Sequence, residues 1–258
     1  MLDESKTIDT PAGVRVRAAA PGNHLLRALG QDDLDLLAPD RRQEPVIPGQ
    51  ILLEPRDVPE DAFFPVEGTV LSILAVTADR KPVETTMTGA EGAVGALFGP
   101  QAAAYGFRVQ VLTGGAVLRV PAARLGAALD ASRPLRAQMG RYVAALLGQV
   151  RIGVACAALH TVEVRAARWM LDLQDRLGDR SLPLTQEALA DLLGVRRTTI
   201  TRVVAALEAR GLVRHRRGRI IVMDRTGLER ASCECHALAH DQFDALTPDL
   251  YPRAAATA

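Results

Sequence analysis

Residues 184–223 constrain the fold of this 258-residue chain more than any other segment. Thr185 is placed to cap a short helix, and Gly194-Val195 indicates a tight turn directly after it. A second helix is predicted at about 197–209, since a glycine follows it where helices often end. Residues 212–223 then predict a small hairpin around a glycine-containing turn. Two helices joined by a glycine turn and followed by a hairpin are typical of a winged helix-turn-helix.

The second predicted helix has two chemically distinct faces. At about 100° per residue, apolar residues such as Ile200 and Val204 point to one side and a polar group points nearly opposite. Forked arginine donors fit guanine edges in the major groove of DNA, and threonine supplies hydroxyl or methyl contacts. We therefore predict that four residues read DNA bases: Arg197, Thr198, Thr201 and Arg202.

Positive charge is concentrated around the same helix. Residues 196–219 contain eight arginines and one acid, Glu208, so the segment carries +7 in a chain whose net charge is +1. Such segregation is typical of a surface that binds a polyanion, although a solvated basic surface would share the composition. The helix-turn-helix pattern favours the first alternative. We expect contacts with DNA phosphates from Arg196, Thr185, Arg214, Arg216, Arg217 and Arg219.

Residues 44–120 consist of short apolar runs separated by turn residues such as Pro48-Gly49 and Gly114-Gly115. No helical stretch long enough for a crossover separates the runs. The pattern predicts an antiparallel barrel or double-sheet roll rather than βαβ units.

A long helix is predicted after this region, with Ser132 as its cap and Pro134 in its first turn. Its apolar residues step by alternating four and three, and the stripe is wide enough to pack on the roll and on a second copy of the helix. A helix buried wholly within one chain is the alternative. We expect a homodimer whose interface contains Leu135, Met139, Tyr142, Leu146, Gln149 and Val150.

The N-terminal segment and the overall composition predict where the chain works. Residues 1–20 carry acids and arginines without an apolar core, so they do not resemble a signal peptide. We expect that no stretch approaches the roughly 18 apolar residues that a membrane helix needs. We expect a soluble, cytoplasmic protein with no membrane partner.

Two other functional classes compete with DNA binding. The sequence contains no Gly-rich nucleotide loop before a helix, no GxSxG and no HExxH, and we expect it not to be an enzyme. A ligand-binding regulatory subunit without a DNA function would leave the arginines of the predicted hairpin unexplained.

Several segments resemble the Crp/Fnr family of bacterial transcription regulators over about residues 22–224. The most specific are Leu-Thr-Gln-Glu-Ala-Leu-Ala at 184–190, Gly-Val-Arg-Arg-Thr-Thr-Ile-Thr-Arg at 194–202 and Leu-Glu-Ala-Arg-Gly-Leu-Val at 207–213. Pro-Gly-Gln-Ile-Leu at 48–52 and Phe-Phe-Pro-Val-Glu-Gly at 63–68 resemble the family's cyclic-nucleotide-binding-type domain. Family members often have an acid where Thr198 stands, so the operator of this protein is expected to differ from the usual half-site.

The resemblance implies an α+β protein that binds double-stranded DNA as a homodimer, with RNA polymerase and an unidentified small-molecule effector as further partners to consider. Its expected parts are a flexible tail (1–20), a β-roll sensor domain (21–130), a dimerisation helix (131–159), a winged helix-turn-helix DNA-binding domain (160–228) and a C-terminal tail (229–258).

The expected effector pocket departs from the family pattern. Ala96 stands where cyclic-nucleotide binders carry a glutamate, and Tyr105-Gly106 aligns with the phosphate-binding positions. Arg108 is three residues away, and an odd shift along a strand reverses the face. A buried phosphate without its cation would be poorly compensated. We therefore expect no binding of cyclic AMP or cyclic GMP in the usual way, with the corresponding pocket at Glu91, Gly92, Gly95, Ala96 and Tyr105.

The cysteine content limits the cofactor chemistry. Iron–sulfur sensing in this family needs about four cysteine ligands, and the chain has three, none of them near its N-terminus. Cys233, Cys235, His236 and His240 form a C-x-C-H-x-x-x-H segment that suggests metal binding or a response to oxidation. An ordinary C-terminal segment is the alternative, and the spacing matches no standard zinc pattern. We expect no metal and no cofactor.

Overall fold

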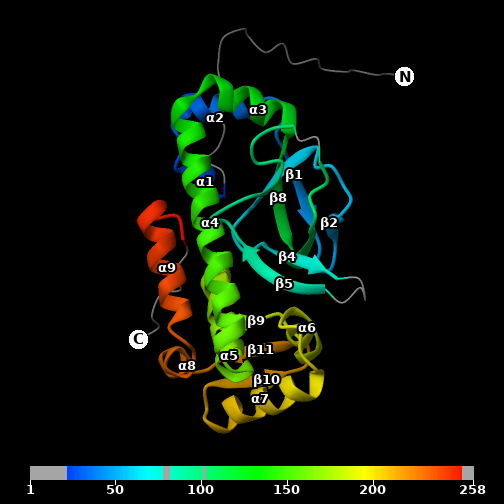
Figure 1. Ribbon diagram of the computed structural model, residues 1–258, viewed down its shortest axis with the longest axis vertical. Helices are drawn as coiled ribbons and strands as arrows, with labels where there is room; N and C mark the ends of the chain where they lie inside the picture. Colours follow the sequence, from blue (N-terminus) through cyan, green and yellow to red (C-terminus); the bar gives the residue numbers. More distant parts are fainter. Residues whose placement is uncertain (1–21, 78–81, 101–102, 252–258) are drawn as a thin grey trace, which may run out of the picture.

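The computed structural model describes residues 22–77, 82–100 and 103–251 (Figure 1). The expected N-terminal tail, residues 1–20, lies outside these residues. Within them the α+β class and its order of parts are confirmed: an antiparallel β-roll, a long helix and a C-terminal helix-turn-helix with a hairpin. Two short helices, α1 (His24–Arg27) and α2 (Gln31–Leu37), precede the roll.

The roll is made of two four-stranded antiparallel sheets, ordered β1-β8-β3-β6 and β2-β7-β4-β5. Alternating apolar residues from both sheets, among them Leu71, Val109 and Val117, fill the space between them. The double-sheet roll predicted from the turn spacing is therefore correct. The strands are β1 (Arg42–Val46), β2 (Ile51–Leu53), β3 (Asp61–Pro65), β4 (Val70–Val76), β5 (Pro82–Thr88), β6 (Val94–Gly95), β7 (Arg108–Thr113) and β8 (Gly115–Pro121).

Helix α3 (Ala122–Ala131) leads into α4 (Arg133–Leu159), the longest helix of the structure. Ser132 caps α4 as predicted, since its hydroxyl accepts a hydrogen bond from the backbone N–H of Leu135 at 3.1 Å. The apolar inner face of α4 packs against the roll and α1, while one edge contacts the last described helix, α9 (Cys235–Leu246). Gly148 permits that contact, because a Cβ there would overlap the side chain of Gln242.

The residues predicted to form the dimer interface on α4 need correction. Leu135, Met139 and Tyr142 are buried within a single chain, and the Tyr142 hydroxyl donates to the carbonyl of Ala93 at 2.7 Å. Leu146 is partly buried in the same core. A wide apolar helix can place either side of its stripe inward, and the inward side here is the one that periodicity marked most strongly. The outward apolar side includes Ala144, Leu147, Val154 and Ala158.

Helix α4 also corrects the expectation about membranes. Among the described residues it is the one helix long and apolar enough to cross a bilayer, judged by length and composition alone. A single helix of this kind is weak evidence for a membrane, because helices of soluble proteins pass the same test. The sequence reading missed it because small residues, alanine and glycine, dilute the larger apolar side chains.

The C-terminal part begins with α5 (Val162–Leu177), which ends at Gly178 in a left-handed conformation. A short strand that was not predicted, β9 (Ser181–Leu182), comes next. The predicted elements then follow in order: α6 (Gln186–Leu192), α7 (Arg197–Ala209), β10 (Val213–Arg216) and β11 (Arg219–Val222). Residues 229–258 were expected to be a C-terminal tail, but the described part of this segment is folded. Helix α8 (Arg225–Ala231) leads into α9, which folds back along α4 (Figure 1).

One apolar core joins the helix-turn-helix to the roll. It is centred on α5, where Trp169 and Met170 are buried, and it includes Leu74 and Met87 from the sheet that contains β4 and β5. The helix-turn-helix is therefore held against the roll in this structure, with α7 at the end of the molecule opposite α2 and α3 (Figure 1).

Candidate nucleic-acid interface

Helices α6 and α7 are set by their caps and by the turn between them. The Thr185 hydroxyl accepts a hydrogen bond from the backbone N–H of Ala188 at 3.1 Å, which caps α6 as predicted. Gly194 adopts a φ of 66° in the turn, a conformation that other residues adopt at a cost. Its Cα also faces Val83 of β5, and a Cβ would approach that side chain to 3.2 Å. A larger residue there would disturb both the turn and its contact with the roll.

The two faces predicted for α7 are present. Its inner face is buried in the domain core through Ile200, Val203, Val204 and Leu207. Its outer face is exposed, and it brings together all four residues predicted to read bases: Arg197, Thr198, Thr201 and Arg202. Arg196 is the N-cap residue of α7 and is exposed beside them.

Gln186 belongs to this surface and was missed in the sequence. Its side-chain oxygen accepts a hydrogen bond from the Thr201 hydroxyl at 2.9 Å. That hydroxyl is also within 3.1 Å of the backbone oxygen of Arg197. Thr201 therefore has its proton engaged inside the protein, and its methyl group and oxygen lone pairs are what it can offer to a ligand. Helical phase within 197–209 could not reveal a partner on the preceding helix.

The hairpin forms as predicted and carries the remaining arginines. Strands β10 and β11 pair from Val213 with Val222 to Arg216 with Arg219, which leaves a two-residue turn whose Gly218 has a φ of 75°. Strand β9 pairs with β11 and completes a three-stranded sheet. The arginines on this hairpin are all exposed: Arg214, Arg216, Arg217 and Arg219. Strand β10 packs against α7, and the exposed arginines of α7 and the hairpin together are called the basic surface below.

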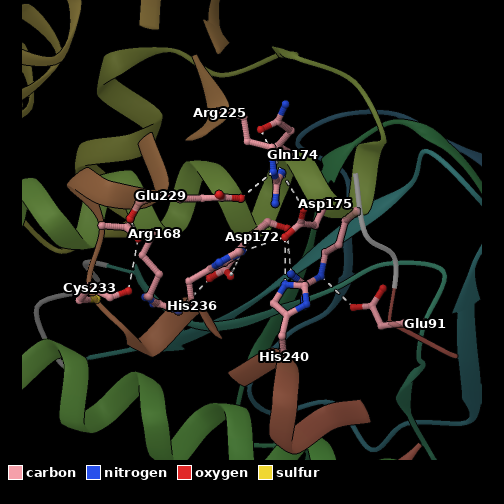
Figure 2. Close-up of polar contacts among 12 residues, drawn as sticks. Glu91, Arg168, Asp172, Gln174, Asp175, Arg225, Glu229, Cys233, His236 and His240 are labelled. Atoms are coloured by element: carbon pink, nitrogen blue, oxygen red, sulfur yellow. Dashed lines mark hydrogen bonds and ion pairs between the residues drawn. The ribbon is translucent and has the colours of Figure 1, made fainter. Parts of the chain in front are cut away.

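An ion-pair network holds the domain in place (Figure 2). Asp175 of α5 accepts hydrogen bonds from Nε2 of His236 and of His240, each at 2.9 Å, and pairs with Arg225 of α8 at 2.8 Å. Burial alone would raise the pKa of Asp175, but the two histidines and Arg225 hold it well below its usual range. The network ties α5, α8 and α9 together behind the basic surface.

A second buried ion pair joins α5 to the roll. Arg176 donates from Nε to Glu91 at 2.8 Å, and both side chains are almost fully buried. Glu91 also accepts the backbone N–H of Gly89. Figure 2 shows Glu91 next to the Asp175 network, and its ion pair with Arg176 means that the roll contacts α5 through charge as well as through apolar packing.

The loop at 89–96, which contains Glu91, also contains most of the residues expected to line an effector pocket. The structure brings Glu91, Gly92, Gly95 and Ala96 together there, all of them buried. Gly92 packs against the Tyr142 ring, and a Cβ at Gly92 would collide with it. Tyr105 is hydrogen bonded to the backbone of Gly95, and burial raises the pKa of its hydroxyl. These residues are thus engaged in contacts within the protein.

A cavity of about 190 Å³ lies between β5, α4 and α5. It was not predicted from the sequence, because its walls come from segments up to about 170 residues apart. Gln149 and Val150, which were expected at a dimer interface, line it together with Trp169. Glu84 is partly buried in its wall, where it accepts a hydrogen bond from the Trp169 indole at 2.5 Å and one from Ser72. Burial raises the pKa of Glu84.

Comparisons with known proteins agree with this arrangement. Residues 164–231 match the Crp-like helix-turn-helix domain family. No curated protein sequence matches the chain significantly. Among solved structures, FixK2 of Bradyrhizobium japonicum is similar with a TM-score of 0.65 and 15% identity, over 75% of this chain and 98% of that one.

Two further solved structures show the same fold. A transcriptional regulator assigned to the Crp/Fnr family from Eubacterium rectale has a TM-score of 0.62 and 18% identity, over 80% of this chain and 96% of that one. CLP of Xanthomonas campestris, described as a c-di-GMP-responsive global regulator, has a TM-score of 0.60 and 19% identity, over 75% and 99% of the two chains. The resemblance predicted from the sequence is confirmed.

Proposed function

We propose that this chain, which carries a Crp-like helix-turn-helix domain in the fold of Crp/Fnr regulators, is a cytoplasmic regulator of transcription that binds specific DNA sequences as a homodimer. The observation that carries the proposal is the surface of α7. Its apolar side is anchored in the domain core, while Arg197 and Arg202 are exposed on the opposite side, with Arg197 4.0 Å from the exposed carboxylate of Glu187. A helix of this kind fits the major groove of DNA.

Different parts of the surface serve affinity and specificity. Arg197, Thr198 and Arg202 stand on the outer face of α7, where side chains of a recognition helix meet base edges. The arginines of the hairpin stand on a turn beside it and suit the phosphate backbone, which they neutralise without reading sequence. Arg196 and Thr185, the N-cap residues of α7 and α6, suit phosphates as well.

The outward side of α4 supports the homodimer. Ala144, Leu147, Val154 and Ala158 repeat with heptad spacing and are exposed, with Leu147 47% and Val154 66% accessible. Arg151 is the one charged residue in this stripe. A second copy of the helix would bury these side chains around a twofold axis. The two α7 helices would then meet an inverted repeat with half-sites about 34–36 Å apart.

The structure of the loop at 89–96 supports a sensor that does not bind cyclic nucleotides in the usual way. The buried cation nearest the loop is Arg176, and Glu91 already neutralises it. A cyclic phosphate would enter without a free cation, at a high electrostatic cost. Calorimetric titration with millimolar cyclic AMP should give no binding heat; micromolar binding that alters DNA affinity would contradict this part of the proposal.

A gel-shift experiment with genomic DNA fragments at several salt concentrations tests the main proposal. A regulator should retain a subset of fragments in complexes that weaken steeply as salt rises, because counterions are released from each neutralised phosphate. A ligand-binding subunit without a DNA function, or an enzyme, would shift no fragment. Equal retention of every fragment would leave general DNA binding and would contradict a specific operator.

A further inference from the structure

The three cysteines of the chain meet at one point, together with a histidine. Cys156 and His160 lie four residues apart, so both point to the same side at the C-terminal end of α4. Cys233 and Cys235 flank the start of α9. The three thiols and an imidazole nitrogen all lie within 4.8 Å of one another. From the sequence we expected no metal, and the set of possible ligands considered there joined Cys233 and Cys235 to His236 and His240.

The separations between these atoms suit a single tetrahedral ion. The Sγ atoms of Cys156 and Cys233 are 3.5 Å apart, and Sγ of Cys235 is 3.5 Å from Nδ1 of His160. With zinc–sulfur bonds of about 2.3 Å and zinc–nitrogen bonds of about 2.0–2.1 Å, tetrahedral geometry places such atoms about 3.5–3.8 Å apart. A cluster of two or more irons would need a wider spacing than these four atoms have.

The surroundings of His160 provide an independent indication. Its Nδ1 faces Cys235, while its Nε2 faces a carboxylate oxygen of Glu234 at 3.7 Å. Histidines that bind a metal usually turn the other ring N–H toward a carboxylate, which fixes the tautomer and makes the ligand nitrogen more basic. Glu234 would therefore place the proton on Nε2 and leave the Nδ1 lone pair free for an ion.

Charge around the cluster points the same way. Three thiolates and one neutral imidazole around a divalent ion carry a net charge of −1. The guanidinium of Arg168 lies beside Cys156 and Cys233 and can balance that charge. The rest of the cluster is apolar, since Ile152 and Val164 pack against the buried cysteines.

The second group of potential ligands is less suited to a cation. Asp172, His236 and His240 also lie within 4.8 Å of one another. Both histidines are already hydrogen bonded to Asp175, and Arg225 and Arg168 form ion pairs with the two aspartates of this region. The carboxylates that a cation would need there are therefore already neutralised.

We propose that Cys156, His160, Cys233 and Cys235 bind one Zn²⁺ ion per chain in a tetrahedral site with no open position. Binding releases the three thiol protons to solvent and involves no change of oxidation state. The ion joins the end of α4 to the α8–α9 junction, next to the residues where α4 turns into α5. Zn²⁺ therefore stabilises the connection between the long helix and the helix-turn-helix.

Metal titration of the full chain tests the site. The protein is reduced, stripped with a chelator and titrated with Zn²⁺, and with Co²⁺ as a spectroscopic probe. We expect one ion per chain, thiolate-to-cobalt charge-transfer absorption and the intense visible bands of tetrahedral Co²⁺. Zn²⁺ should also raise the melting temperature of the wild-type chain. Absence of a stoichiometric ion, or octahedral Co²⁺ bands, would overturn the proposal.

Single substitutions distinguish the proposed cysteine site from the second group of potential ligands, Asp172, His236 and His240. Cys156→Ser and Cys235→Ser should lose the ion, whereas His236→Gln, from the second group, should keep it. Glu234→Gln should weaken Zn²⁺ binding by about 10–100-fold while retaining tetrahedral bands, as for other carboxylates behind a ligating histidine. The reverse result, loss in His236→Gln with retention in Cys156→Ser, would overturn the assignment.

A cysteine variant that fails to fold would not leave the question open. His160 is partly exposed at the end of α4, so His160→Gln removes a ligand with little change to the core. Circular dichroism of the metal-free variant should match the wild type, and its melting temperature should no longer respond to Zn²⁺. An unchanged response in this folded variant would contradict the proposed ligand set.

Discussion

Arginine residues on the basic surface share one side chain but occupy different settings. Arg197 projects from a helix whose other side is buried, so its guanidinium has a defined direction. Arg216 ends β10, next to the two-residue turn of the hairpin, where its position relative to a groove is less constrained. The direction of a donor matters for base edges, whereas proximity suffices for phosphates.

This difference predicts separate effects of two substitutions on DNA binding. Arg197→Ala should cost about 1–3 kcal/mol on the preferred operator and relax the preference at one base position. Arg216→Ala should weaken all sequences alike and lower the salt slope by about 1. Binding measured on a set of operator variants at several salt concentrations distinguishes them. Identical profiles for the two variants would show that the division of roles is wrong.

Glu84 predicts a pH dependence of stability. Burial raises its pKa in the folded chain above the unfolded value, so the folded state holds the proton more tightly. Its contribution to stability is present at acid pH and decreases as pH rises through the raised pKa. Glu84→Gln keeps an acceptor for the Trp169 indole and removes this decrease.

The free energy of unfolding of the wild type and of Glu84→Gln is measured by chemical denaturation at several values between pH 4 and pH 8. As pH rises, the free energy of unfolding of the wild type should decrease relative to that of Glu84→Gln. Glu84→Ala is the control: it should be less stable than Glu84→Gln at every pH, because Trp169 and Ser72 lose a partner. A difference between wild type and Glu84→Gln that does not change with pH would contradict the role given to Glu84.

Contacts within one helix were predictable at this scale, and long-range partners were not. The outer face of α7 follows from a period of 3.6 residues, so its four polar residues could be placed together from the sequence. The Arg176–Glu91 pair joins residues 85 positions apart. No local pattern marks such a pair, and Glu91 was therefore assigned to an effector pocket rather than to an ion pair.

Among the elements, α4 was predicted correctly as a long helix with a broad apolar surface, but the side of this helix that faces the roll was predicted wrongly. Periodicity established a long helix with a broad apolar surface. It could not decide which side faces the roll, because both sides are apolar and α9 was not foreseen. The segment containing α9 has few large apolar residues and was taken for a tail, although Phe243 anchors it in the core around α4.

The outward side of α4 predicts a variant that separates the copies. Val154→Glu would place a charge in the apolar stripe, and its desolvation in a dimer would cost several kcal/mol. Sedimentation should show monomers at concentrations where the wild type is dimeric, and affinity for an inverted repeat should fall. Leu238→Glu is a matched control, since Leu238 is similarly exposed but lies on α9. A dimer that persists in Val154→Glu would exclude this side of α4.

For the whole molecule, the Asp175 network predicts how stability responds to acid. The pKa of Asp175 is lowered by folding, so its contribution is fully present above the unfolded value of about 3.9 and is lost as pH falls below it. Asp175→Asn should destabilise the chain at pH 7 by about 3 kcal/mol, since Arg225 loses its ion pair with a buried carboxylate and keeps only Glu229 and the amide oxygen of Gln174.

The deficit of Asp175→Asn relative to the wild type should shrink as pH falls from 5 to 3. Denaturant unfolding at fixed pH values measures it, and an exposed substitution, Asp241→Asn, provides the comparison. A deficit that grows toward acid pH would contradict the lowered pKa.

The packing of the residues after α9 against helix α1 has a consequence for biosynthesis. His24 is hydrogen bonded to the carbonyl of Leu250, 226 residues later, and Tyr251 completes the core that holds Leu25 and Phe64. A nascent roll therefore leaves the ribosome with part of its apolar surface uncovered. At translation rates of about 5–20 residues per second, roughly 10 s pass before the residues that cover this surface are synthesised, which is long enough for chaperones to bind it.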